Sequence, residues 1–234
     1  MRQRRSKYPA PFAAILFSVL AMSAPAPAEP LSHWPDGFLG RVEALAVIQT
    51  LNAGLLGGRS ATLTLEKWCA DHKMAAEPKV IARLVTGVEK PPSDEQRRRL
   101  RVAADEPVRY RRVQLSCGGH VLSEADNWYV PARLAPEMNR LLETTDTPFG
   151  KVVSALNPVR RTFAVETLWE PLPRGWEQER AIAREELRGP LDAPRELFTH
   201  RAILYADDRQ PISEVKETYT NEILGFDAVG AGTR

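Results

Sequence analysis

Apolar residues recur at helical spacing in several parts of the chain. The clearest case ends at the glycine pair Gly57 and Gly58, as amphipathic helices often do. A second, shorter helix follows the hydroxyl-rich Thr62-Leu63-Thr64, which can cap it. Proline at a first helical turn predicts further starts. We therefore expect helices over residues 42–55, 65–77 and 136–142, one opened by Pro148, and a charged one over 176–187.

Other segments are rich in β-branched and aromatic residues and are bounded by turn residues. Two glycines, Gly118 and Gly119, separate one pair of such segments, and they suit the positive φ angles of a tight hairpin. A polar turn over residues 206–210 separates a second pair. The predicted strands are residues 79–88, 108–117, 120–130, 160–169, 197–205 and 212–224. Adjacent hairpins with helices between them indicate an α+β fold, an antiparallel sheet packed with helices.

The first 28 residues have the pattern of a secretory signal peptide. Four basic side chains precede a short apolar run, and Ala26-Pro27-Ala28 offers a cleavage site. The run is shorter than the roughly 20 apolar residues that span a bilayer, so cleavage is favoured over the alternative of an uncleaved anchor. We expect a periplasmic or secreted protein without a stable membrane anchor. Sec and Tat export both stay open.

The expected division of the chain follows from these patterns. It consists of a signal peptide (1–28), an N-terminal helical segment of the domain (29–58), the main domain (59–225) and a flexible tail (226–234).

Cleavage changes the charge of the protein. The whole chain carries a formal net charge of +2, and loss of the four basic residues leaves −2. Nucleic-acid-binding domains usually present a basic patch. The arginine run 97–99 is offset by Asp94 and Glu95, which indicates a solvated surface. We therefore expect no nucleic-acid partner.

The chain has only two cysteines, Cys69 and Cys117. Disulfides persist in exported proteins, so the two can pair. The alternative, two buried free thiols, stays open because sequence does not show whether their Cα atoms approach within about 7 Å.

Common catalytic and metal-binding motifs are absent from the sequence. It has no Gly-x-Ser-x-Gly elbow, phosphate loop, Rossmann glycine pattern or His-Glu-x-x-His, and its four histidines are scattered. None of them lies at metal-ligand spacing from another histidine or a cysteine. We expect no metal site and no cofactor.

Alternation along the predicted strands sorts charged residues by face. Arg111, Val113 and Leu115 share the more apolar row, and Arg112 belongs to the polar one. Arg112 therefore points either to solvent or into a polar ligand cavity, where its guanidinium would form a bidentate pair with a carboxylate.

Glu217 lies between Val215 and Tyr219 on one face of its strand, whereas Glu214 belongs to the other face. Partial burial would raise the pKa of the Glu217 carboxyl and let it donate a proton near neutral pH. Ordinary surface pairing is the alternative for both glutamates.

The order of several short segments resembles the chorismate pyruvate-lyase family and, more distantly, the UTRA ligand-sensing domains of some repressors. The matching pieces are residues 62–64, 109–117, 128–136, 146–150 and 207–219. The resemblance implies helical flaps over a buried site on an antiparallel sheet. It also implies cofactor-free elimination of pyruvate from chorismate, which leaves 4-hydroxybenzoate.

The resemblance also implies roles for individual residues. The carboxylate-binding arginine falls on Arg112, and a second arginine that closes over the ligand falls on Arg133. Backbone contacts fall on Leu63 and Phe149. The glutamate that protonates the ring oxygen falls on Glu217, with Glu214 as the substitute if the register shifts.

Three classes of function follow from these expectations. The first is an exported chorismate lyase-like enzyme, which acts on chorismate or a related enolpyruvyl ether. The second is a non-catalytic periplasmic binding module for a small aromatic carboxylate. The third is an envelope scaffold for partner contacts. The oligomeric state stays open.

Overall fold

The computed structural model describes residues 31–178 and 189–226. The predicted signal peptide and residues 227–234 of the predicted tail lie outside this range, as does most of the charged helix predicted over 176–187. Its first residues, 176–178, lie in a turn. Within the described residues, no helix is long and apolar enough to cross a membrane.

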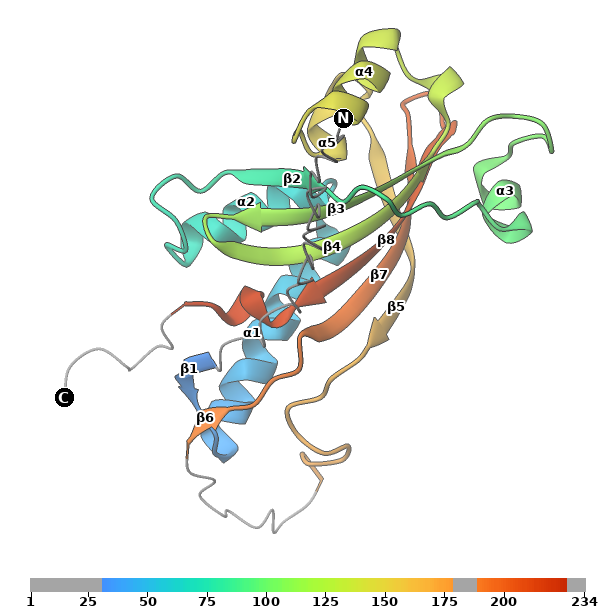
Figure 1. Cartoon of the computed structure of the whole chain (residues 1–234). Helices are drawn as coiled ribbons and strands as arrows, with labels where there is room; N and C mark the ends of the chain where they lie inside the picture. Colours follow the sequence, from blue (N-terminus) through green and yellow to red (C-terminus); the bar gives the residue numbers. More distant parts are fainter. Residues whose placement is uncertain (1–30, 179–188, 227–234) are drawn as a thin grey trace, which may run out of the picture.

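A six-stranded antiparallel sheet forms the centre of the domain (Figure 1), which confirms the α+β prediction. Its spatial order is β2-β3-β4-β8-β7-β5. Hairpins join β3 to β4 and β7 to β8, at the two places where turn residues predicted them. The strands are β2 (Val80–Leu84), β3 (Arg109–Cys117), β4 (His120–Tyr129), β5 (Val159–Thr167), β7 (Glu196–Tyr205) and β8 (Pro211–Thr220).

Helices cover one face of this sheet, which we call the inner face (Figure 1). The main core lies between that face and two helices, α1 and α2. A smaller cluster packs beneath α4 and α5 at one end of the sheet. The elements are α1 (Phe38–Gly57), α2 (Ala61–Asp71), α4 (Pro136–Thr144) and α5 (Phe149–Val152), with short 3-10 turns at Pro131–Arg133, Ser154–Leu156 and Asn221–Leu224.

The start of α2 differs from the sequence prediction. Ser60, rather than a threonine of the 62–64 segment, is the N-cap, and its hydroxyl accepts a hydrogen bond from the Leu63 amide at 3.4 Å. Thr62 and Thr64 therefore lie inside the helix. The earlier start brings the first turn of α2 to the inner face of the sheet.

Three elements were not predicted. Helix α3 (Asp94–Leu100) contains the arginine run that was interpreted as a solvated surface. Ser93 and Gln96 form a capping box at its start, a signal that was present in the sequence. Strands β1 (Leu31–Pro35) and β6 (Pro190–Leu191) pair as a separate two-stranded sheet. Because both strands are short and far apart in the chain, no local sequence pattern predicted their pairing.

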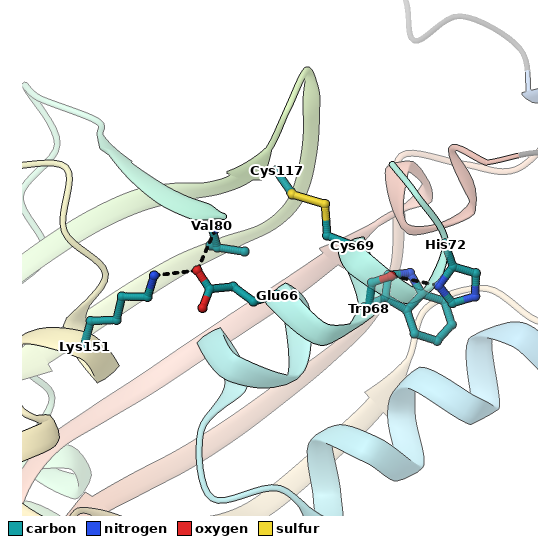
Figure 2. Close-up of a disulfide and its surroundings, with 7 residues drawn as sticks. All are labelled: Glu66, Trp68, Cys69, His72, Val80, Cys117 and Lys151. Atoms are coloured by element: carbon teal, nitrogen blue, oxygen red, sulfur yellow. Dashed lines mark hydrogen bonds and ion pairs between the residues drawn. A yellow bond between two sulfur atoms is a disulfide. The ribbon is translucent and has the colours of Figure 1, made fainter. Parts of the chain in front are cut away.

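A disulfide between Cys69 and Cys117 joins α2 to the end of β3, with the Cα atoms 6.4 Å apart (Figure 2). Of the two possibilities left open by the sequence, the structure therefore has the bonded one. One turn earlier in α2, Glu66 accepts hydrogen bonds from the Val80 amide (2.9 Å) and from Lys151. These contacts hold α2, β2, β3 and α5 together around one end of the sheet.

Candidate functional site

A cavity of about 580 Å³, counting its open mouth, lies between the inner face of the sheet and the starts of α2 and α5. Apolar side chains from β3, β4 and β8 form its floor, and polar groups lie around them. The floor residues are Val113, Leu115, Ala125 and Val215, and the charged lining residues are Arg59, Arg111, Arg160 and Glu217.

Arg111 is the notable group in this cavity. Its side chain is on β3 and the residue is only 5% exposed. Its Nη2 donates to the carbonyl oxygens of Thr147 (3.2 Å) and Thr145 (3.4 Å), while its Nε has no hydrogen-bond partner. Within the described residues, no carboxylate forms a salt bridge with it. Burial lowers the pKa of the Arg111 guanidinium, an effect that Tyr129 and Asp146 partly offset.

Burial of a cation without an anionic partner costs several kcal/mol even after relaxation and water penetration. A ligand carboxylate would remove this cost and could use the vacant Nε donor. Arg111 is therefore a candidate attachment point for an anion.

The N-terminus of α2 forms one wall of the same cavity. Ser60, Ala61 and Thr62 line it, and the first amides of a helix have no acceptor within the helix. Gly150 of α5 lies against this wall: a Cβ at that position would be 3.1 Å from Ser60 Oγ and 3.3 Å from Thr62 Oγ1. The close approach of α5 to α2 therefore favours glycine at position 150.

At the other end of the cavity, Glu217 is part of a buried network. Its Oε2 accepts hydrogen bonds from Arg160 on β5 and from the Tyr219 hydroxyl at 3.0 Å. Complete burial, followed by the charge of Glu217, raises the pKa of Tyr219. Glu217 thus acts as an acceptor in an ion pair, and the expectation that it donates a proton has no support from this geometry.

His200 lies opposite Glu217 on the neighbouring strand β7. Burial, and then the positive charge of Arg160, lowers the pKa of His200 to about 4, although Glu217 acts against this shift. The ring nitrogen Nε2 is 2.7 Å from Asn52 Oδ1 of α1. At neutral pH the imidazole is therefore uncharged, and it connects the network to α1.

The cavity position predicted for Arg112 is wrong. Strand alternation puts Arg111 and Arg112 on opposite faces, and it is Arg111 that lines the cavity. Arg112 lies on the outer face, where its Nη2 is 3.0 Å from Glu124 Oε2. The two rows of residues were correctly assigned. Of the two directions that alternation left open for Arg112, the structure has the one away from the cavity, because α1 and α2 enclose the apolar row.

Three more expected ligand contacts do not reach the cavity. Arg133 donates to backbone carbonyls of Leu100 and Pro211, both at 2.6 Å, so it is held in place instead of closing over a ligand. Leu63 is within α2 and is 60% exposed, outside the cavity lining. Glu214 is buried on the outer face, where Arg99 Nε and Nη2 donate to it at 2.7 and 2.8 Å.

Phe149 and Glu217 do line the cavity, as expected. Sequence reasoning missed Arg111 and Arg160. A signal for Arg111 was available, because an arginine within an apolar row has no solvent to face. Arg160 had no such signal, since its pairing with Glu217 joins strands 57 residues apart.

Metal chemistry has no candidate centre in the described part of the chain, where no three His, Cys, Asp or Glu side chains cluster to hold an ion. The cavity instead combines guanidinium groups, one paired carboxylate, helix amides and an apolar floor. Such a site can hold an organic anion.

Comparisons with known proteins give limited structural similarity and one close relative. No family model matches the chain. Among solved structures, PhnF from Mycobacterium smegmatis is similar at 17% identity and a TM-score of 0.48, covering 76% of this chain and 71% of that one. Its effector domain alone gives 14% identity and a TM-score of 0.47, covering 71% and 91%.

A GntR-family transcriptional regulator from Enterococcus faecalis gives 13% identity and a TM-score of 0.36, covering 60% of this chain and 93% of the regulator. One sequence relative is a Sinorhizobium fredii protein, described as the uncharacterized protein y4mC. It is 47% identical over 221 residues, which cover 92% of this chain and 93% of the relative. At this identity and coverage, the chain belongs to the family of Sinorhizobium fredii y4mC.

Proposed function

We propose that the protein binds a small organic carboxylate in the cavity between the sheet and α2. The observation that carries the proposal is Arg111, a buried guanidinium that lines the cavity and forms no salt bridge among the described residues. A carboxylate would supply the missing charge and a bidentate acceptor.

An aromatic body suits the rest of the cavity. Val113, Leu115, Ala125 and Val215 provide an apolar floor, and Phe149 borders it. Glu217 lies two strands away from Arg111, across β4, which corresponds to roughly 10 Å between strand axes. A benzoate-type ligand can place its carboxylate at Arg111 and its ring over the floor. Its far end then points toward the Glu217 network.

Binding without turnover is favoured over the lyase activity that the family resemblance implies. General acid catalysis requires a proton donor within reach of the departing oxygen. Glu217 instead accepts hydrogen bonds from Arg160 and Tyr219 through Oε2. Glu217, the predicted general acid, thus serves as the anionic partner of Arg160. The cavity is therefore better suited to bind an anion than to protonate one.

We also propose that the protein works outside the cytoplasm. The signal-peptide pattern supports this, and so does the bond between Cys69 and Cys117, since structural disulfides are rare in reducing compartments. Cell fractionation with N-terminal sequencing tests the idea. A mature N-terminus at Glu29 in the periplasmic or secreted fraction agrees with export, and a cytoplasmic protein that retains Met1 contradicts it.

Calorimetric titration of the mature, oxidised protein with 4-hydroxybenzoate tests the binding proposal. Wild type should bind, and Arg111→Met should lose about 10- to 100-fold in affinity, because a hydrogen-bonded charge contributes about 1.5–3 kcal/mol. Arg112→Met is the matched control and should bind as wild type does. Equal affinity in all three proteins, or no binding by wild type, contradicts the assignment of this ligand class to the cavity.

Incubation of the same protein with chorismate separates binding from catalysis. We expect no 4-hydroxybenzoate above the uncatalysed background. Product formation that Glu217→Gln abolishes would restore the lyase hypothesis and reject a purely binding role.

A further inference from the structure

The two edges of the six-stranded sheet are protected to different degrees. Edge strand β2 is five residues long, and its Ala82 amide donates to the Asp146 carbonyl at 2.8 Å. The opposite edge, β5, is nine residues long and pairs only with β7 among the described residues. A long edge strand with unpaired backbone groups is a template for another strand.

Large apolar side chains are concentrated at the β5 edge. Among the described residues, eight large hydrophobic side chains are notably exposed, and half of them lie on β5 or directly after it: Val159, Phe163, Val165 and Leu168. Monomeric proteins usually protect such an edge with lysines, prolines or a very short strand. The nine residues of β5 include no lysine or proline, and its protective features are the bulge at Phe163 and the inward-pointing Arg160. Its outward-facing backbone groups remain available to a partner strand.

The sequence of β5 is complementary to itself. In its pairing with β7, Thr162 is opposite Ala202 and Ala164 is opposite Arg201, so Phe163 is an extra, bulged residue. Because of this bulge, Arg161 and Glu166 lie on the same face of the sheet, opposite Ile203 and Thr199 of β7. Without the bulge, their odd spacing would put them on opposite faces.

If the bulged Phe163 is left out of the register, as it is in the pairing with β7, a second β5 strand can pair antiparallel about a two-fold axis centred on Ala164. In this register Arg161 of each copy is opposite Glu166 of the other, and Val159 is opposite Leu168. Both pairs occur twice by symmetry, as an isologous interface requires. Opposite charges and apolar side chains are the favourable cross-strand pairs.

From this self-complementarity we propose that the protein forms a two-fold symmetric dimer through β5, which joins two six-stranded sheets edge to edge. The partner at this edge is a second copy of the chain, because in an antiparallel β5–β5 pair each Arg161 is opposite a Glu166. The proposal is independent of ligand binding in the cavity.

Charge exchange tests this interface, with sedimentation equilibrium of the mature protein as the measurement. Wild type should dimerise at micromolar concentrations. Arg161→Glu and Glu166→Arg should each weaken the dimer by about tenfold or more, since each places like charges opposite one another twice. Both residues are exposed, so the fold should be kept. Arg83→Glu, on the other edge strand β2, is the matched control and should dimerise as wild type does.

Mixing the two variants provides the decisive measurement. Arg161→Glu carries glutamate at both positions, and Glu166→Arg carries arginine at both, so the two proteins complement each other in the proposed register. The mixture should form a heterodimer with about wild-type affinity, and the double exchange in one chain should restore the homodimer. A monomeric wild type, variants as dimeric as wild type, or a mixture that stays monomeric would each overturn the proposal.

Discussion

The two faces of the sheet treat their charged residues differently. On the outer face, buried or half-buried carboxylates have cationic partners: Glu214 with Arg99 and Arg201, Glu124 with Arg112 and Arg195, and Asp126 with Lys90. On the inner face, Glu217 is paired with Arg160, and Arg111 remains without a carboxylate among the described residues. Each of these outer-face carboxylates therefore has a cationic partner, whereas the enclosed face holds a buried guanidinium, that of Arg111, with no carboxylate beside it among the described residues.

This difference indicates where a ligand can contribute binding energy. An anion at the outer face would compete with carboxylates already in place. An anion in the cavity would replace nothing and would neutralise Arg111. The comparison therefore depends on two points. The ion pairs of the outer face must stabilise the fold, and the unpaired Arg111 must lower the free energy of unfolding when no ligand is bound.

Removal of the Glu214 charge should produce the largest loss of stability. Glu214 is 1% exposed and holds Arg99 of α3 and Arg201 of β7. Breaking a buried pair costs about 3–5 kcal/mol, and because both arginines are partly exposed we expect Glu214→Gln to lose about 3 kcal/mol in urea unfolding. Glu124→Gln, on the same face but less buried, should lose about 1 kcal/mol. Equal losses would mean that burial of the outer pairs is unimportant.

Acidification should destabilise the inner face through His200. Its pKa is lowered to about 4 in the folded protein, against about 6.5 when unfolded. The unfolded chain therefore takes up the proton first, so this stabilisation is present above pH 6.5 and is lost as the pH falls toward 4. Between pH 7 and pH 5, wild type should lose about 2 kcal/mol more than His200→Gln, as measured by urea unfolding at both values. Parallel losses would contradict a neutral, buried His200.

The smallest effect should be a gain. Without ligand, Arg111→Met removes an uncompensated buried charge and keeps an apolar stem, so its unfolding free energy should rise by about 1 kcal/mol. Arg112→Met should instead lose up to about 1 kcal/mol, because it breaks a partly exposed pair with Glu124. A marked destabilisation by Arg111→Met would show that the guanidinium is needed by the fold itself, which would remove the main argument for an anion site.

The sequence was sufficient for the sheet and its hairpins, because alternation and turn residues are local signals. It also placed Val215, Glu217 and Tyr219 on one face of β8. It was not sufficient to decide which face the helices cover, and the arginine to which the family resemblance gave the carboxylate role, Arg112, lies on the other face. The roles of Arg133 and Arg160 depend on contacts between distant strands and loops, which no local pattern records.

The bond between Cys69 and Cys117 has a practical consequence for any study of the cavity. It ties the helix that supplies one wall to the strand that carries Arg111. Polypeptide prepared with reductants, or left in a bacterial cytosol, would keep that wall in place only through non-covalent contacts such as those of Glu66. Thiol titration before each affinity experiment would show whether Cys69 and Cys117 are oxidised. Weak binding by the oxidised protein could then be distinguished from weak binding caused by reduction of the disulfide.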